Sequence, residues 1–223
     1  MKKITLITLL AIAGFSFSAF MKAQTQATSP FEGVITYSIS TDNDQAAQMV
    51  GTSATFYIKG DKTKQVKDGM FSTMVFEDNN KPNHPVILIS AMGNKYLLKN
   101  DTTKVDTATP VIKYIDGTKK IAGYMCSKAE VTTTMKGESV TAIVYYTADI
   151  VIKQSKNDPF RGLKGFPLEY SVSQQGVQIT YSATKVKQQT LTDDVFIPHT
   201  SGYKVMTEDE IKEDIQEKMQ SGN

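Results

Sequence analysis

The chain has 223 residues, of which 40% are hydrophobic and 22% are charged, and it contains no Trp and a single Cys. Its 25 basic and 23 acidic residues give a formal net charge of +2, and the first 23 residues carry three of the Lys, so the remainder has 22 basic residues against 23 acidic ones. This balance argues against nucleic acid or an anionic membrane surface as a partner. Cys126 cannot form an internal disulfide and is expected to be a small buried hydrophobe.

Residues 1–23 have the pattern of a secretory signal peptide. Lys2 and Lys3 precede an apolar run from Ile4 to Phe20, and small residues follow near Ala23, which is the order of a cleavable signal. The alternative is a membrane anchor, which needs about 20 apolar residues, whereas this run is interrupted by Thr, Ser and Gly. No Cys near this segment offers a sulfur for lipid attachment. We therefore expect a periplasmic or secreted protein that is not integral to a membrane once it has been processed.

Residues 24–30 form a polar segment that we expect to be flexible, and residues 31–223 form one mainly β domain. Alternating apolar and polar residues dominate this part of the chain, as in strands with one buried face. The residues from Asp42 to Val50 are expected to form a short helix between two strands. The strands are predicted at residues 35–39, 54–58, 70–76, 86–89, 95–99, 128–135, 139–147, 168–172 and 177–183.

Short joints that contain Gly separate these strands, for example at Gly60-Asp61 and Gly93-Asn94. Tight hairpins use Gly for its positive φ, and a parallel crossover needs a dozen or more residues. The joints therefore predict a meander of antiparallel hairpins.

A C-terminal helix is predicted at residues 207–220. Thr207 with Glu210 three residues later forms a capping box. Ile211, Ile215 and Met219 make a narrow apolar stripe at a spacing of four residues, so we expect one edge of the helix to dock on the sheet and its end to fray.

The sequence offers no pattern typical of a catalytic or metal site. The two His residues, His84 and His199, each lie beside a Pro and have no second ligand at metal-binding spacing. No nucleophile elbow and no phosphate-binding loop is present. We therefore expect no catalytic residue, no bound metal and no cofactor, and hence a protein that is not an enzyme.

The segment from Asp158 to Tyr170, DPFRGLKGFPLEY, is the most informative part of the chain. It has no regular periodicity, yet it is rich in apolar residues that must be buried somewhere. It is either a plug at one end of the sheet or a lid over an apolar pocket. For the lid, we predict a gate made of Phe160, Leu163, Phe166 and Leu168 and pocket walls that include Met70, Met74, Tyr145 and Tyr170. Met and aromatic side chains suit a pocket that accepts varied apolar ligands.

Several blocks resemble a family of secreted envelope proteins without an assigned activity. The blocks are IAGYMCSKAEV at 121–131, VYYTADI at 144–150 and FRGLKGFPLEY at 160–170, together with FEGVITYSIS near the start and GYKVMTEDEI near the end. The chain is also similar to the GLPGLI family, although it has GLKGFPL where that family has its name-giving motif. The resemblance implies a fold like the lipoprotein carriers LolA and LolB, which is an open antiparallel half-barrel capped by helices around a hydrophobic cavity.

Two hypotheses of function follow. The first is a protein that binds a lipid, an acyl chain or a lipidated partner protein in the concave face of a curved sheet. Desolvation of the apolar ligand would drive its binding, and Tyr hydroxyls at the rim would orient it. The alternative is a structural or interaction protein of the envelope that has no small ligand. The sequence leaves open the oligomeric state, the ligand and whether the half-barrel is hollow or filled.

Overall fold

The computed structural model describes residues 30–81, 85–99, 109–135, 138–156, 158–174 and 176–221. The predicted signal peptide and most of the polar segment after it lie outside these residues, as does His84. Within the described residues, no helix is both long and apolar enough to cross a membrane.

One 12-stranded sheet makes up most of the described chain, in the order β12-β6-β5-β4-β3-β2-β1-β11-β10-β9-β8-β7. All neighbouring strands are antiparallel except β12 and β6. The elements are β1 (Glu32–Thr41), α1 (Asp44–Val50), β2 (Ser53–Lys59), β3 (Lys62–Asp68), β4 (Phe71–Asp78), β5 (Val86–Ala91), β6 (Asn94–Leu98), β7 (Val111–Ile121), β8 (Tyr124–Met135), β9 (Glu138–Thr147), β10 (Phe166–Gln174), β11 (Val177–Gln188), the 3-10 helix η2 (Asp193–Phe196), β12 (Lys204–Met206) and α2 (Glu208–Ser221).

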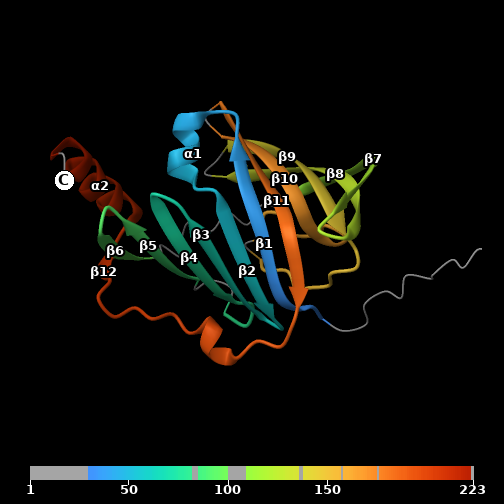
Figure 1. The fold of residues 1–223 in the computed structure, drawn as a ribbon, viewed down its shortest axis with the longest axis horizontal. Helices are drawn as coiled ribbons and strands as arrows, with labels where there is room; N and C mark the ends of the chain where they lie inside the picture. The colour runs from blue at the N-terminus through green and yellow to red at the C-terminus, as the bar shows by residue number, and fades with distance from the viewer. Residues whose placement is uncertain are drawn as a thin grey trace, which may run out of the picture.

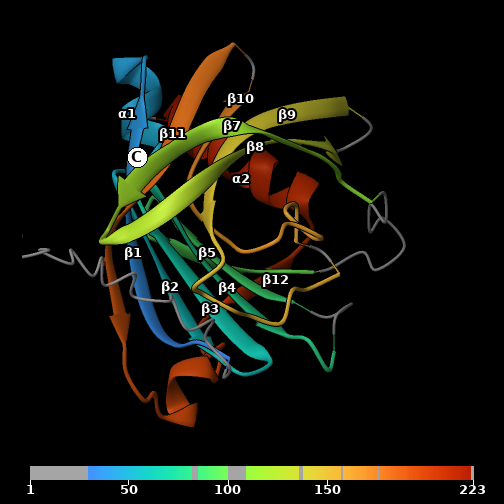
Figure 2. The ribbon, with the colours of Figure 1, turned by 90° about the vertical axis from the view of Figure 1, so that its right-hand side faces the viewer.

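The sheet is open and strongly curved, and it has two arms that meet at the pair β1–β11 (Figures 1 and 2). One arm runs from β2 to β6, and the other runs from β11 back to β7. The second arm curls so far that Lys119 of β7 forms an ion pair with Glu169 of β10 at 2.7 Å, although two strands separate them in the sheet. This confirms the predicted fold class, a mainly β open sheet of antiparallel hairpins with short helices.

Three strands were not predicted, and each lacks the alternating pattern. β3 reads KTKQVKD, β7 is exposed and rich in charged residues, and β12 has only three residues. The polar β7 suits a strand at the edge of a sheet, where charged side chains discourage pairing with other chains. The parallel pairing of β12 with β6 depends on the long connection after β11, which local patterns do not report.

Both predicted helices are present. Asn43 caps α1 by accepting a hydrogen bond from the Ala46 N–H at 2.9 Å. Before α2, the Thr207 N–H donates to Glu210 Oε2 at 2.7 Å and the Glu210 N–H donates to Thr207 Oγ1 at 3.3 Å, which is the expected capping box.

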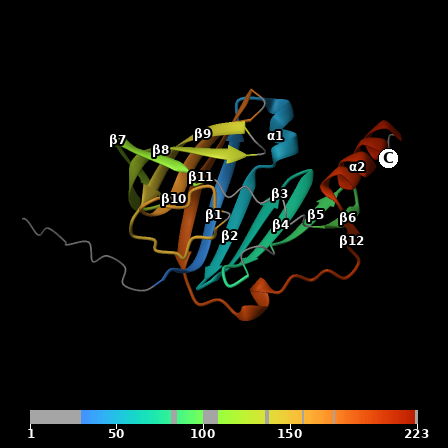
Figure 3. The same ribbon diagram turned by 180° about the vertical axis from the view of Figure 1, so that it is seen from behind.

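The docking of α2 is as narrow as the sequence predicted. Ile211 is buried against Ala91 and Tyr96, Ile215 packs at the edge of this cluster, and Met219 is exposed. The helix therefore lies against the end of the first arm, far from the curled arm (Figure 3).

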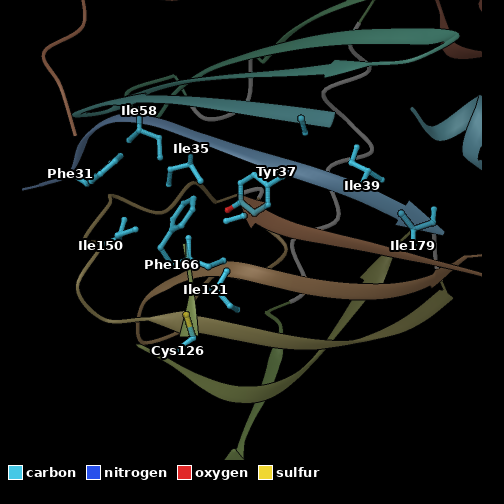
Figure 4. Close-up of a cluster of buried hydrophobic side chains, with 13 residues drawn as sticks. Phe31, Ile35, Tyr37, Ile39, Ile58, Ile121, Cys126, Ile150, Phe166 and Ile179 are labelled. Carbon is cyan, nitrogen blue, oxygen red and sulfur yellow. The ribbon is translucent and has the colours of Figure 1, made fainter. Parts of the chain in front are cut away.

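The core lies on the inner side of the curl and is divided into clusters. The largest cluster joins β1 and β2 to β10 and to the β7–β8 hairpin, and it includes Ile35, Ile58, Phe166 and Cys126 (Figure 4). Cys126 is buried, as predicted, and burial raises the pKa of its thiol to about 11. A second cluster lies within the curled arm. Burial of apolar surface in these clusters is the main force that holds the two arms together.

A candidate ligand site on the concave face

An irregular segment closes the mouth of the curved sheet. We call residues 148–165, which connect β9 to β10, the covering segment; they cross the opening between the two arms (Figure 2). On one side the Lys164 N–H donates to the Tyr114 hydroxyl of β7 at 3.2 Å. On the other side the Asn79 amide, just after β4, donates to the Lys153 carbonyl at 2.7 Å. The segment is therefore tethered to both arms.

The Gln154 side chain organises the interior of the covering segment. Its Oε1 accepts from the Gly162 N–H at 2.8 Å, and its Nε2 donates to the Leu163 carbonyl at 3.2 Å. The Phe160 N–H donates to Asp158 Oδ1 at 2.8 Å. These bonds replace the backbone pairing that a segment without regular structure lacks.

Gly165 allows the segment to join β10. A Cβ on this residue would lie 2.3 Å from the Thr147 carbonyl oxygen of β9, which is closer than atoms can approach. This position therefore accepts only Gly, and the covering segment passes close to the end of β9 where it joins β10.

The predicted gate residues are all buried, each less than 10% exposed. Phe160 and Leu163 pack within the second cluster, against Ala129 and Val144. Phe166 and Leu168 begin β10 and belong to the largest cluster. The structure thus places all four predicted residues in the core, two in each of these clusters.

Of the predicted wall residues, the two Tyr pack against the core and the two Met lie away from the gate. Tyr170 lies on the concave face with the gate, against the ring of Phe160. Tyr145 packs at the edge of the largest cluster, with the ammonium groups of Lys119 and Lys128 over its ring at 5.6 and 5.9 Å. Met70 lies in the β3–β4 turn and is 48% exposed.

Met74 is on the opposite face of the sheet. Along β4, Met74 and Phe76 share one face, and Phe76 pairs with Lys64 of β3. Val75 and Glu77 share the other face, and Glu77 is close enough to Asp158 of the covering segment for the two charges to interact. Alternation in the sequence identifies residues that share a face, but not which face curves inward. Met74 is therefore no part of the concave wall, contrary to the prediction.

A chain of aromatic rings lines the concave face beneath the covering segment, and it was not predicted as a unit. Tyr37 contacts Phe56 and Tyr170, with ring centroids 5.3 and 6.4 Å apart. Tyr170 also stacks on Tyr181 at 4.7 Å and contacts Phe160 of the covering segment at 4.9 Å. We call these five residues the aromatic cluster. It links β1, β2, β10, β11 and the segment, so only the tertiary structure reveals it.

The hydroxyl groups of this cluster differ in how they are satisfied. The Tyr37 hydroxyl donates to the Pro167 carbonyl at 2.6 Å. The hydroxyls of Tyr170 and Tyr181 form no hydrogen bond with the part of the chain that the structure describes. Burial nonetheless raises the pKa of both, and for Tyr170 the neighbouring Tyr181 and Asp158 add to this effect. Both residues are only half-buried, and their two hydroxyls thus remain available to a ligand or to water.

Two acidic groups face each other at the rim of the cluster. Burial raises the pKa of Asp158, against the opposing effects of the Phe160 N–H and of Arg161. Burial also raises the pKa of Glu77 on β4, and the proximity of Asp158 raises it further. The concave face therefore combines apolar rings with phenolic hydroxyls and with two carboxyls whose pKa is raised. Among the described residues no three His, Cys, Asp or Glu side chains gather as a metal site.

Comparisons with known proteins report the fold alone. No family model matches the chain, and no curated protein matches it, so the resemblance to the GLPGLI family stays a prediction. Two structures of PNGF-II are 20% identical to the chain, with TM-scores of 0.51 and 0.48; each alignment covers 83% of this chain and 33% of PNGF-II.

The chain thus spans about a third of PNGF-II. The likeness at a TM-score of 0.51 shows that a part of PNGF-II has a related fold. The lipoprotein LppX of Mycobacterium tuberculosis is 12% identical over 73% of this chain and 90% of LppX, with a TM-score of 0.41.

Proposed function

We propose that the protein is an exported protein of the cell envelope that binds a hydrophobic ligand on its concave face. The ligand would be a lipid, an acyl chain or the acyl group of a lipidated protein. One observation supports this most: the hydroxyls of the half-buried Tyr170 and Tyr181 lie in an apolar cluster, without a hydrogen-bond partner among the described residues. The proposed role is binding, without catalysis.

The physical case rests on the cost of unpaired polar groups. A fully buried hydroxyl without a partner costs about 1–3 kcal/mol, and the half-buried Tyr170 and Tyr181 bear a part of this cost. A ligand with a carbonyl, ester or carboxyl oxygen would accept from these hydroxyls, and its hydrocarbon part would contact the rings of Phe56 and Tyr37. Hydrophobic ligand sites commonly have this composition, an apolar wall with a few polar groups that fix orientation.

The covering segment would act as the gate. Phe160 and Leu163 occupy the apolar space that a ligand would need, so the ligand must displace them. Hydrocarbon of the ligand would then pack where these two side chains had packed, which offsets the cost of moving them. The tethers at Lys153 and Lys164 would let the segment move without leaving the sheet. The gate residues Phe166 and Leu168 would remain with β10.

A second role is favoured by the burial of all four gate residues. If the covering segment never moves, it is a permanent plug, and the protein is a structural or interaction protein of the envelope. The two roles make opposite predictions about ligand content.

Native mass spectrometry of the protein purified from its own envelope, with organic extraction alongside, separates the two roles. A discrete copurifying lipid supports the binding role and identifies the ligand class. An unliganded mass, with no uptake of added fatty acids or phospholipids, contradicts it and favours the plug. Cell fractionation tests export directly.

Matched variants locate the ligand. Replacing Tyr170 and Tyr181 together with Phe is expected to weaken lipid binding about tenfold or more, since two hydrogen bonds are lost, and Phe166→Asp is expected to abolish it. Tyr57→Phe, on the other face of β2, is the control. A hydrolase screen tests the absence of catalysis: an activity that disappears in Cys126→Ala or His199→Ala would contradict it.

A further inference from the structure

A groove lies on the outer, convex face of the sheet, under the connection between β11 and β12. We call residues 189–203 the strap (Figures 1 and 3). Near its start, Lys59 Nζ of β2 donates to the Leu191 carbonyl at 2.7 Å and forms an ion pair with Asp193 at 3.1 Å. At its end, β12 pairs with β6. The strap is therefore fixed at both ends and crosses the outer face of the first arm.

Between the strap and the sheet is a half-open groove of about 310 Å³. Its floor consists of Met74, Phe76 and Leu88, from β4 and β5, and its other wall includes Ile197 and Tyr203 of the strap. Met74 pairs directly with Leu88 across the two strands, so the floor is a continuous apolar surface.

Two ammonium groups lie at this groove. Lys64 Nζ is 5.3 Å from the centre of the Phe76 ring, and Lys95 Nζ is 5.7 Å from the centre of the Tyr203 ring. Neither Lys forms an ion pair with a carboxylate in the described part of the chain. Cation–π contacts hold an ammonium group in place, and they leave its N–H donors free to meet an anion.

The remaining polar lining is small. It consists of His199, Ser201 and one carboxylate, Asp194. The two Lys outweigh this carboxylate by one positive charge, so the groove attracts anions in spite of Asp194.

We propose that the groove under the strap binds a single acyl chain that ends in a carboxylate. The apolar floor removes the chain from water, and the ammonium groups of Lys64 and Lys95 bind the anionic end. The volume is at the lower end of the range of about 300–1,000 Å³ found for small-molecule sites, so one chain fits and a lipid with several chains does not. This site is on the opposite face from the aromatic cluster and does not depend on ligand binding there.

Calorimetric titration of the purified full chain with dodecanoate, below the concentration at which it forms micelles, tests the proposal. Dodecanol and dodecyltrimethylammonium are the comparison probes. We expect dodecanoate to bind at least about fivefold more tightly than either, because charge-assisted hydrogen bonds to the two Lys are worth more than neutral ones. The double variant Lys64→Gln, Lys95→Gln is expected to bind dodecanoate roughly tenfold more weakly. Lys113→Gln with Lys187→Gln, on exposed positions of β7 and β11, is the matched control.

A second variant distinguishes the loss of the groove from the loss of the fold. Ile197 is 50% exposed, so Ile197→Glu should fold normally while it narrows the groove and adds a negative charge, and it is expected to abolish dodecanoate binding. Three results would each overturn the proposal: no binding of dodecanoate by the wild-type chain, equal binding by the Lys64 and Lys95 double variant, or binding that is lost in Tyr170→Phe but kept in Ile197→Glu. The last result would place the ligand on the concave face.

Discussion

Phe160→Ala tests whether the covering segment is packed as described. Phe160 is 9% exposed, lies in the second cluster and contacts the Tyr170 ring at 4.9 Å. Truncation of a buried Phe to Ala costs about 3–5 kcal/mol, which includes the cavity it leaves, and an aromatic pair adds about 0.5–1.5 kcal/mol. Because the segment is irregular and can partly collapse into the cavity, we expect a loss at the lower end, about 3 kcal/mol.

Urea denaturation followed by far-UV circular dichroism measures this loss, since the chain has no Trp to report by fluorescence. With a denaturant dependence of about 2–3 kcal/mol per molar urea, the midpoint should fall by about 1–1.5 M. The melting temperature should fall by roughly 6–12 °C for a chain of this size. Val151→Ala, an exposed position on the same segment, is the control and should change the unfolding free energy by less than about 0.5 kcal/mol.

A small loss of stability would contradict this packing. If Phe160→Ala changes the free energy of unfolding by less than about 1 kcal/mol, the side chain is not in the core. The covering segment would then be open in solution, and the reasoning about a closed gate would fail. If the loss is full and hydrogen exchange rises only in residues 148–165, the segment opens as a separate unit.

Three further outcomes are expected. Tyr170→Phe should raise the free energy of unfolding by up to about 1 kcal/mol, since it removes an unpaired hydroxyl from a half-buried side chain; a lower denaturation midpoint would show that the hydroxyl has a partner. Thr207→Ala should cost about 1 kcal/mol by removing the cap of α2, seen as a lower melting temperature, and an unchanged melting temperature would mean that α2 contributes little to stability. Burial raises the pKa of Glu77, so the stability that this residue contributes is full below the ordinary carboxyl range, about pH 4, and is lost as the pH rises through the raised pKa. Glu77→Gln should therefore flatten the decline of the unfolding free energy with pH, measured by urea titrations at several pH values. An unaltered decline would exclude Glu77 as its source.

Local patterns in the sequence determined most of the strands and both helices. Alternation marked β1 and β2, Gly marked the hairpin joints, and Thr207 with Glu210 marked the start of α2. These features depend on neighbours within a few residues, so one sequence is enough to read them. The composition of the 158–170 segment also indicated, from its apolar content alone, that it had to be buried.

The tertiary structure decided how these elements curve and which faces meet. Strand alternation groups Met74 with Phe76, but only the curvature puts both of them on the outer face, away from the gate. The aromatic cluster joins Tyr37 of β1 to Tyr170 of β10, which lie far apart in the sequence, and the groove joins β4 to the strap over a similar separation. Such contacts depend on how twist accumulates over many strands and on where long connections cross the sheet, and no pattern within a single segment encodes them.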